Sequence, residues 1–129
     1  MSDVNVKVPA RPNFVHIFRS VIASIAASAD FTYDEIDDLR LAVDEACAQL
    51  LVVGGDATTL SMLIRNLDGG GVEILTSIDA EGAPWPPAGA EHTLTWQVLS
   101  ALADEARFEQ MDGHPALRLT KRRVPAGAN

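Results

Sequence analysis

The sequence is short of cysteine, aromatic residues and positive charge. Its one cysteine, Cys47, can form no internal disulfide, which fits a reducing compartment and a buried, inert thiol. Aromatic residues make up 5% of the chain, so the hydrophobic content of 47% must build a core mainly from aliphatic side chains. Ten Lys and Arg against 18 Asp and Glu give a formal net charge of −8, which argues against direct binding to nucleic acid or anionic lipid.

The sequence also lacks the segments that direct a protein into or across a membrane. No apolar run approaches the ~18 residues that a spanning helix needs. No basic stretch followed by an apolar one comes after Met1, so we expect no signal peptide and a cytoplasmic location. A length of 129 residues predicts a single domain over 1–129.

The hydrophobic periodicity predicts strands interspersed with helices. The predicted strands are 4–8, 59–65, 72–78 and 116–121. The predicted helices are 13–28, a second one that follows a loop at 30–33 and stops at 54–56, and a third from 93 or 95 to about 106. A loop is expected over 79–91 and a frayed tail over 122–129. This order predicts an α+β fold, a two-layer sandwich in which three helices cover one face of a mixed, mostly antiparallel sheet.

Local signals set several of these boundaries. Thr32 with Glu35 three residues later is a capping-box pattern for the second helix, and Gly54 ends that helix. Thr93 or Thr95 can cap the third helix. The turn-rich run 66–71 predicts a hairpin between the strands on either side of it, and Asp112-Gly113 marks a further turn. Trp85, which lies between prolines, is expected to fold onto the core, although an exposed anchor is the alternative.

The second helix carries a polar pair on the edge of its apolar stripe. Glu45 and Gln49 are four residues apart, so both side chains point the same way. A carboxylate and an amide stacked in this way can serve a nucleotide and its metal ion. They can equally form a solvated helix edge. The residues of this helix leave both interpretations open.

The run 38–47, Asp-Leu-Arg-Leu-Ala-Val-Asp-Glu-Ala-Cys, resembles the N-box helix of the bacterial anti-sigma factor and serine-kinase family. That family has the Bergerat fold, shared with histidine kinases, gyrase and Hsp90. The resemblance implies ATP and magnesium as cofactors. It makes Glu45 the general base, puts Gln49 at the magnesium-binding position, and matches Asp79 to the residue that recognises adenine and Gly82 to one of the glycines that follow it. For Asp79, a strand-end turn residue is the equal alternative.

The nucleotide boxes depart from the family pattern in four places. After Gly82, the run Ala83-Pro84-Trp85 does not follow the pattern. Gln49 stands where the family has an asparagine, and Val53 stands where it has a histidine. The connection 92–96, His-Thr-Leu-Thr-Trp, carries no glycine directly before the third helix, where the family has a glycine-rich lid that wraps the phosphates. The resemblance therefore predicts a weakened nucleotide site in which Glu45 is a relic of the kinase.

The resemblance also implies protein partners and a role in transcription regulation. Arg19, on the first helix, matches an arginine that the family uses for partner contact. The implied partners are a sigma factor and an anti-anti-sigma factor, together with a second copy of the chain through the first helix or the outer face of the sheet. Two functions follow, a regulatory protein that sequesters a sigma factor, or an ATP-dependent serine/threonine-protein kinase acting on an anti-anti-sigma factor.

Overall fold

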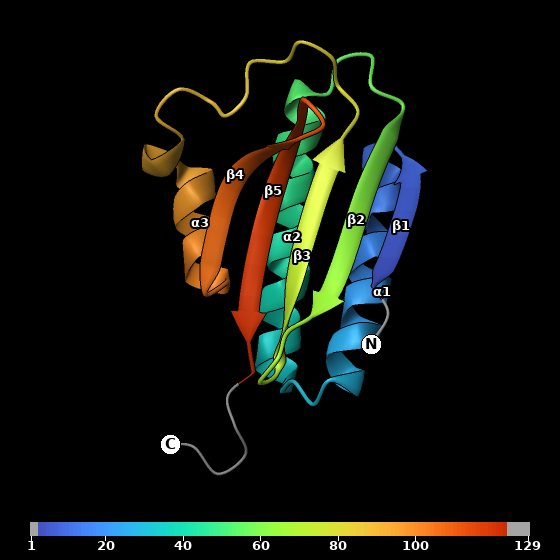
Figure 1. The fold of residues 1–129 in the computed structure, drawn as a ribbon, viewed down its shortest axis with the longest axis vertical. Coiled ribbons are helices and arrows are strands. Elements are labelled where there is room, and N and C mark those ends of the chain that lie inside the picture. The colour runs from blue at the N-terminus through green and yellow to red at the C-terminus, as the bar shows by residue number, and fades with distance from the viewer. Residues whose placement is uncertain (1–2, 124–129) are drawn as a thin grey trace.

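A computed structural model describes residues 3–123 as two layers, a sheet and a row of helices (Figure 1). The elements are β1 (Val4–Pro9), a 3-10 turn η1 (Pro12–Phe14), α1 (Val15–Ser28), α2 (Tyr33–Val53), β2 (Thr59–Asn66), β3 (Gly71–Ile78), a 3-10 turn η2 (Ala90–His92), α3 (Leu94–Leu102), β4 (Glu105–Met111) and β5 (His114–Arg122). The predicted tail began at Arg122, but this residue ends β5. Positions 124–129 of that tail lie outside the described residues.

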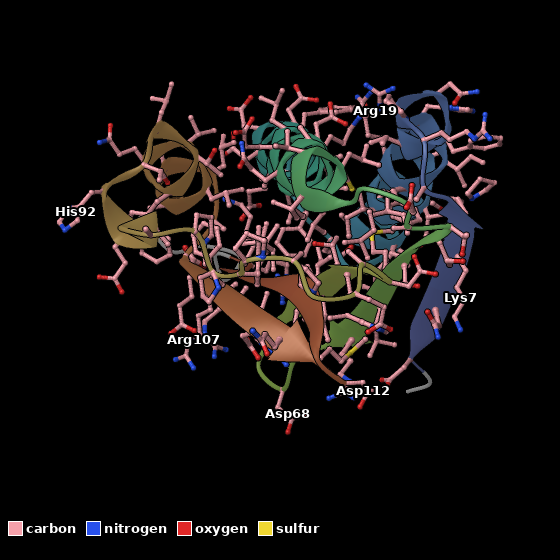
Figure 2. All side chains as sticks on the ribbon, turned by 90° about the horizontal axis from the view of Figure 1, so that it is seen from above. Lys7, Arg19, Asp68, His92, Arg107 and Asp112 are labelled. Atoms are coloured by element: carbon pink, nitrogen blue, oxygen red, sulfur yellow. The ribbon has the colours of Figure 1, made fainter. Side chains whose placement is uncertain are left out.

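The five strands form one sheet in the order β1-β2-β3-β5-β4, and every neighbouring pair is antiparallel. The α-helices of residues 3–123 all lie on one face of this sheet, as the end-on view shows (Figure 2). The predicted α+β sandwich is therefore confirmed. Within the same residues, no helix is both long enough and apolar enough to cross a bilayer.

The core fills the space between the two layers. Alternate residues of β2, Leu60, Met62 and Ile64, are buried against the helices, as their period of two predicts. Cys47 on α2 is fully buried too, and burial, with a smaller contribution from the charge of Asp44, raises the pKa of its thiol to about 12. The predicted burial of the Cys47 thiol is thus confirmed.

The longest helix, α2, begins and ends where its sequence signals predict. The Thr32 hydroxyl accepts a hydrogen bond from the Glu35 N–H at 3.2 Å, and the Glu35 carboxylate accepts one from the Thr32 N–H at 2.8 Å. The helix stops at Val53, one residue before Gly54. A Cβ on Gly54 would lie 2.8 Å from Ile78 Cδ1, so glycine allows the helix end to approach β3 closely.

The predicted third helix was wrong at its end, because it ran to about Ala106 and overlooked β4. The helix ends at Leu102, and the chain turns at Asp104, whose N–H donates to the Thr120 carbonyl at 2.9 Å. Asp112 and Gly113 both have positive φ and join β4 to β5 as a two-residue hairpin turn. Buried Ala106 continued the helical apolar spacing, which hid the strand alternation that begins there.

Candidate functional site

The carboxylate of Glu45 joins α2 to the first turn of α3. Glu45 is half-buried, and its Oε1 accepts a hydrogen bond from Thr95 Oγ1 at 3.0 Å. The position of Thr95 is set by Thr93, which caps α3 by accepting from the Trp96 N–H at 3.1 Å. The predicted cap at Thr93 is confirmed, whereas Thr95, the other cap candidate, instead binds the residue predicted to be a general base.

The second residue of the polar pair, Gln49, has no comparable partner. It is half-buried one turn beyond Glu45 on α2, and its amide makes no side-chain hydrogen bond within residues 3–123. No group of three or more His, Cys, Asp or Glu in that range is arranged to hold a metal ion. A magnesium ion that binds together with a nucleotide usually keeps several waters and takes only one or two protein oxygens beside the phosphates. The groups around Gln49 within residues 3–123 therefore form no metal site of their own, and the amide oxygen offers one ligand position.

Asp79 is held at the end of β3 by the beginning of β2. Its Oδ1 accepts from the N–H groups of Thr58 and Thr59, each at 2.9 Å, and its Oδ2 accepts from Thr58 Oγ1 at 2.7 Å. Desolvation alone would raise the pKa of the Asp79 carboxyl, but these hydrogen bonds outweigh it, so the pKa lies below its ordinary value. The carboxylate therefore ties the end of β3 to the start of β2.

Asp79 also lies on the side of the sheet away from the helices. It lines a cavity of about 390 Å³ together with Ser61 and Ser77. These two serines lie opposite one another and alternate with the inward residues of β2 and β3, so they point out from the helix-free face. The next residue, Ala80, is buried in the core. The predicted alternation placed Ile78 inward, so the sequence already held a signal that Asp79 points outward. Glu45 and Asp79 therefore do not face one shared space.

The bonds of Asp79 predict a pH-dependent effect of Asp79→Asn. Because the folded pKa is lowered, ionised Asp79 stabilises the fold above its unfolded pKa, and this stabilisation is lost as pH falls through the folded pKa. After discounting for solvent screening, we expect Asp79→Asn to cost about 1 kcal/mol near neutral pH. Urea denaturation at neutral and acidic pH measures the difference, with Asp68→Asn on the exposed β2–β3 turn as control. An effect of equal size at both pH values would contradict the assignment.

The loop between β3 and η2 is anchored by Trp85. This side chain is 5% exposed, and its Nε1 donates to the carbonyls of Glu109 at 2.8 Å and Ala116 at 3.2 Å. In return, Gln110 Nε2 donates to the Trp85 carbonyl at 2.7 Å. Trp85 therefore folds onto the core, as predicted. Gly82 lies earlier in the loop, where it is exposed and has a φ of 66°, a backbone conformation that favours glycine.

Arg19 lies on the outer side of the helix layer, well away from the sheet (Figure 2). Its Nη1 donates to Asp44 Oδ2 at 3.3 Å, which ties α1 to α2. Around this pair is a groove of about 450 Å³ whose walls include Val15, Leu51 and Val52. The Val52 side chain is 77% exposed. Arg19 thus combines a half-exposed charge with a neighbouring apolar surface.

The structure brings some of the predicted site residues together and separates others. Glu45 and Gln49 share α2, and Arg19 contacts the same helix through Asp44. Asp79 and Gly82 belong to the end of β3 and the loop after it. Among residues 3–123, no buried side-chain nitrogen or oxygen lacks a hydrogen-bond partner.

The sequence is similar to one family model and to several known proteins. A family model described as the histidine kinase-like ATPase domain matches residues 8–121. Anti-sigma-F factor RsbW of Mycobacterium tuberculosis (strain H37Rv) is 30% identical over 105 residues, which are 81% of this chain and 60% of that protein. Serine-protein kinase RsbW of Bacillus subtilis (strain 168) is 48% identical over 44 residues, 34% of this chain and 28% of that protein.

A solved structure extends the similarity to the fold. The crystal structure of the RsbU and RsbW domains of a Mycobacterium tuberculosis protein matches with a TM-score of 0.69 and 23% identity, over 98% of this chain and 34% of that one. The aligned part spans no more than 60% of the length of either relative named above. The comparisons therefore agree on the fold and on the kind of domain.

Proposed function

The chain belongs to the histidine kinase-like ATPase domain family, and on that premise we propose that it is an anti-sigma regulatory protein that binds a sigma factor and is released by an anti-anti-sigma partner. The observation that carries the proposal is the similarity to an anti-sigma-F factor over 81% of the chain. The surface charge agrees with it, because a net charge of −8 suits a basic protein partner better than nucleic acid.

The proposal includes a weakened nucleotide site, and the positions of three side chains support it. Glu45 is bonded to Thr95 on the facing helix, so a ligand that used its Oε1 would have to replace this contact. Asp79 is bonded to Thr58 on the helix-free side. Gln49 offers a single amide oxygen. These features favour partner binding over phosphoryl transfer as the surviving activity.

The alternative function is an active serine/threonine-protein kinase that phosphorylates an anti-anti-sigma factor. One observation favours it, since Glu45 keeps its carboxylate on α2 and forms no ion pair in residues 3–123. A carboxylate in this state can accept the proton of a serine hydroxyl as a general base. A Bacillus subtilis relative is also named a serine-protein kinase. ATP, when bound, would supply the phosphoryl group.

The binding proposal is tested by titrating the full chain with the alternative sigma factors of its own organism. We expect one of them to bind, and we expect Arg19→Ala to weaken that binding by about tenfold or more, since buried interface arginines are frequent hot spots. The matched control is Arg65→Ala, which removes a half-exposed arginine that pairs with Asp3 on the sheet. Binding to none of the sigma factors, or an equal loss with the control, would count against the proposal.

The kinase alternative is tested by thermal unfolding with ATP and magnesium. A working site would stabilise the fold by roughly 2.7 kcal/mol at a hundredfold excess over the dissociation constant. For a weakened site, we expect no measurable shift. Transfer of phosphate to an anti-anti-sigma protein, abolished by Glu45→Ala, would instead support the kinase and refute the weakened site.

A further inference from the structure

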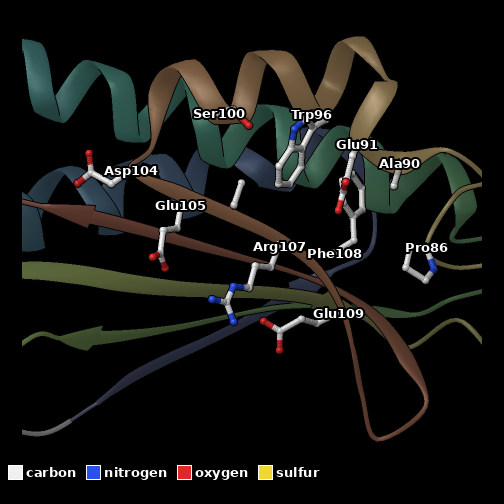
Figure 3. A pocket seen from close by; sticks show the side chains of 11 residues that line it. Pro86, Ala90, Glu91, Trp96, Ser100, Asp104, Glu105, Arg107, Phe108 and Glu109 are labelled. Atoms are coloured by element: carbon white, nitrogen blue, oxygen red, sulfur yellow. The ribbon is translucent and has the colours of Figure 1, made fainter.

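A groove of about 820 Å³ runs between α3 and the edge strand β4 (Figure 3). β4 is the last strand of the sheet, so one of its sides has no neighbouring strand among residues 3–123. The other wall comes from α3 and η2, and includes Ser100 and Glu91. None of the site residues discussed above lines this groove, namely Glu45, Gln49, Asp79, Gly82 and Arg19.

The register of the β4–β5 hairpin shows which backbone groups face this groove. Gln110 lies opposite Pro115, which has no N–H and therefore occupies a non-hydrogen-bonded pair. Hydrogen-bonded and non-hydrogen-bonded pairs alternate along an antiparallel ladder. Ala106, Phe108 and Gln110 thus direct their N–H and C=O groups away from β5, toward the open edge. β4 contains no proline, so a strand added at this edge would find an uninterrupted row of donors and acceptors.

The inner wall of the groove is apolar. Figure 3 shows Trp96 pointing down from α3 toward Phe108 of β4. The two rings are stacked, with centroids 6.0 Å apart, and both side chains are half-buried. In an added strand, every second side chain would point toward these rings and would gain by being apolar.

The charge on the groove is negative. Three exposed acids, Glu91, Asp104 and Glu105, line it, against one exposed base, Arg107. Glu109 also lines it, but its carboxylate is already paired with Arg118 on β5. Glu105 and Arg107 alternate with the inward residues, so they would lie beside the outward side chains of an added strand, where opposite charges attract. The charge balance favours an occupant with basic outward side chains.

We propose that this groove binds an extended, basic segment of a partner protein, which pairs with β4 as a sixth strand beneath α3. Its side chains alternate, with apolar ones against Trp96 and Phe108 and Lys or Arg on the outer side. A second copy of the chain is a poorer occupant, because each copy carries the same net charge of −8. This inference is independent of the proposed sigma-factor binding, since it uses none of the residues of that proposal.

The test is a titration of the isotope-labelled full chain with a synthetic eight-residue peptide of alternating Lys and Val, followed by amide NMR. We expect shifts at Ala106, Phe108 and Gln110. The same peptide with Glu for Lys is expected not to bind. Two further versions carry N-methyl groups on either all Val or all Lys residues. Because strand pairing uses the N–H groups of alternate residues, one methylation pattern should abolish binding and the other should retain it.

Two variants test the charge contribution. The double substitution Glu91→Gln, Glu105→Gln is expected to weaken binding of the basic peptide by about three- to tenfold at low salt. Asp68→Asn is the control, because Asp68 lies on the exposed β2–β3 turn and does not line the groove, and it should leave binding unchanged. Equal binding of the Lys and Glu peptides, tolerance of both methylation patterns, shifts confined to another surface, no binding, or dimerisation of the chain through β4 would each overturn the proposal.

Discussion

Replacing Trp85 with alanine is expected to lower the free energy of unfolding by about 3–5 kcal/mol, the cost typical of removing a buried aromatic side chain. Trp85 is 5% exposed, and its ring lies 5.3 Å from that of Phe108. Its indole N–H donates to two carbonyls of the β4–β5 hairpin. The substitution removes the ring contact and these hydrogen bonds together, and leaves a cavity beneath the loop. Urea denaturation followed by circular dichroism measures the loss.

The conservative variant Trp85→Phe separates packing from hydrogen bonding. It keeps an aromatic ring but loses the indole N–H, so we expect it to cost about 1–2 kcal/mol. Hydrogen exchange adds a local readout, because freeing Trp85 should speed exchange of the amides in 79–93 more than of those in α2. If Trp85→Ala unfolded at nearly the wild-type urea concentration, the loop would not depend on this anchor.

The second large effect is expected at Gly71, where β3 begins. Its φ is +136°, and a Cβ there would lie 2.7 Å from the Lys121 carbonyl oxygen and 2.9 Å from Arg122 Cα. Both obstructing atoms belong to the backbone of β5, which cannot move away without breaking the ladder with β3. Gly71→Ala is therefore expected to cost about 3 kcal/mol, from backbone strain and the clash together.

The matched control is Gly69→Ala, two residues earlier in the same turn. Gly69 also has a positive φ, +86°, but a Cβ there would meet no atom within 4 Å. We expect it to cost about 1 kcal/mol, from the backbone conformation alone. The difference between the two unfolding free energies isolates the close approach of β3 to β5. Equal costs for the two variants would show that the clash is relieved elsewhere.

Much of the fold was predictable because its signals are local. The capping box of Thr32 and Glu35, the stop at Gly54 and the cap at Thr93 each depend on residues within a few positions of one another. The β2–β3 hairpin follows from two alternating runs around a glycine-rich turn. β4 was overlooked because its first inward residue, Ala106, also continued the apolar spacing of α3, so two periods fitted the same residues.

The candidate site was predictable only in part. Helical spacing placed Glu45 and Gln49 on one face of α2, and strand alternation implied the outward direction of Asp79. The partner of Glu45 was not predictable, because Thr95 is fifty residues away in the chain. Successive side chains of a strand point to opposite faces of the sheet. A shift of the strand register by one residue would therefore move a side chain at the strand end, such as that of Asp79, to the other face.

The sequence by itself determined the C-terminal end of α1, both ends of α2, the β2–β3 hairpin and the burial of Cys47, because these features depend on short-range hydrogen bonds and on the hydrophobic periodicity of neighbouring residues. The start of α1 was expected at Asn13 but lies at Val15, after the 3-10 turn η1. The kind of domain was indicated by the resemblance of the run 38–47 to a known family. Only the tertiary structure decided that Glu45 bonds to Thr95, that Trp85 closes over the β4–β5 hairpin, and that β4 presents an open edge beneath α3. These contacts join segments far apart in the chain, and their geometry exists only once the helices have packed on the sheet.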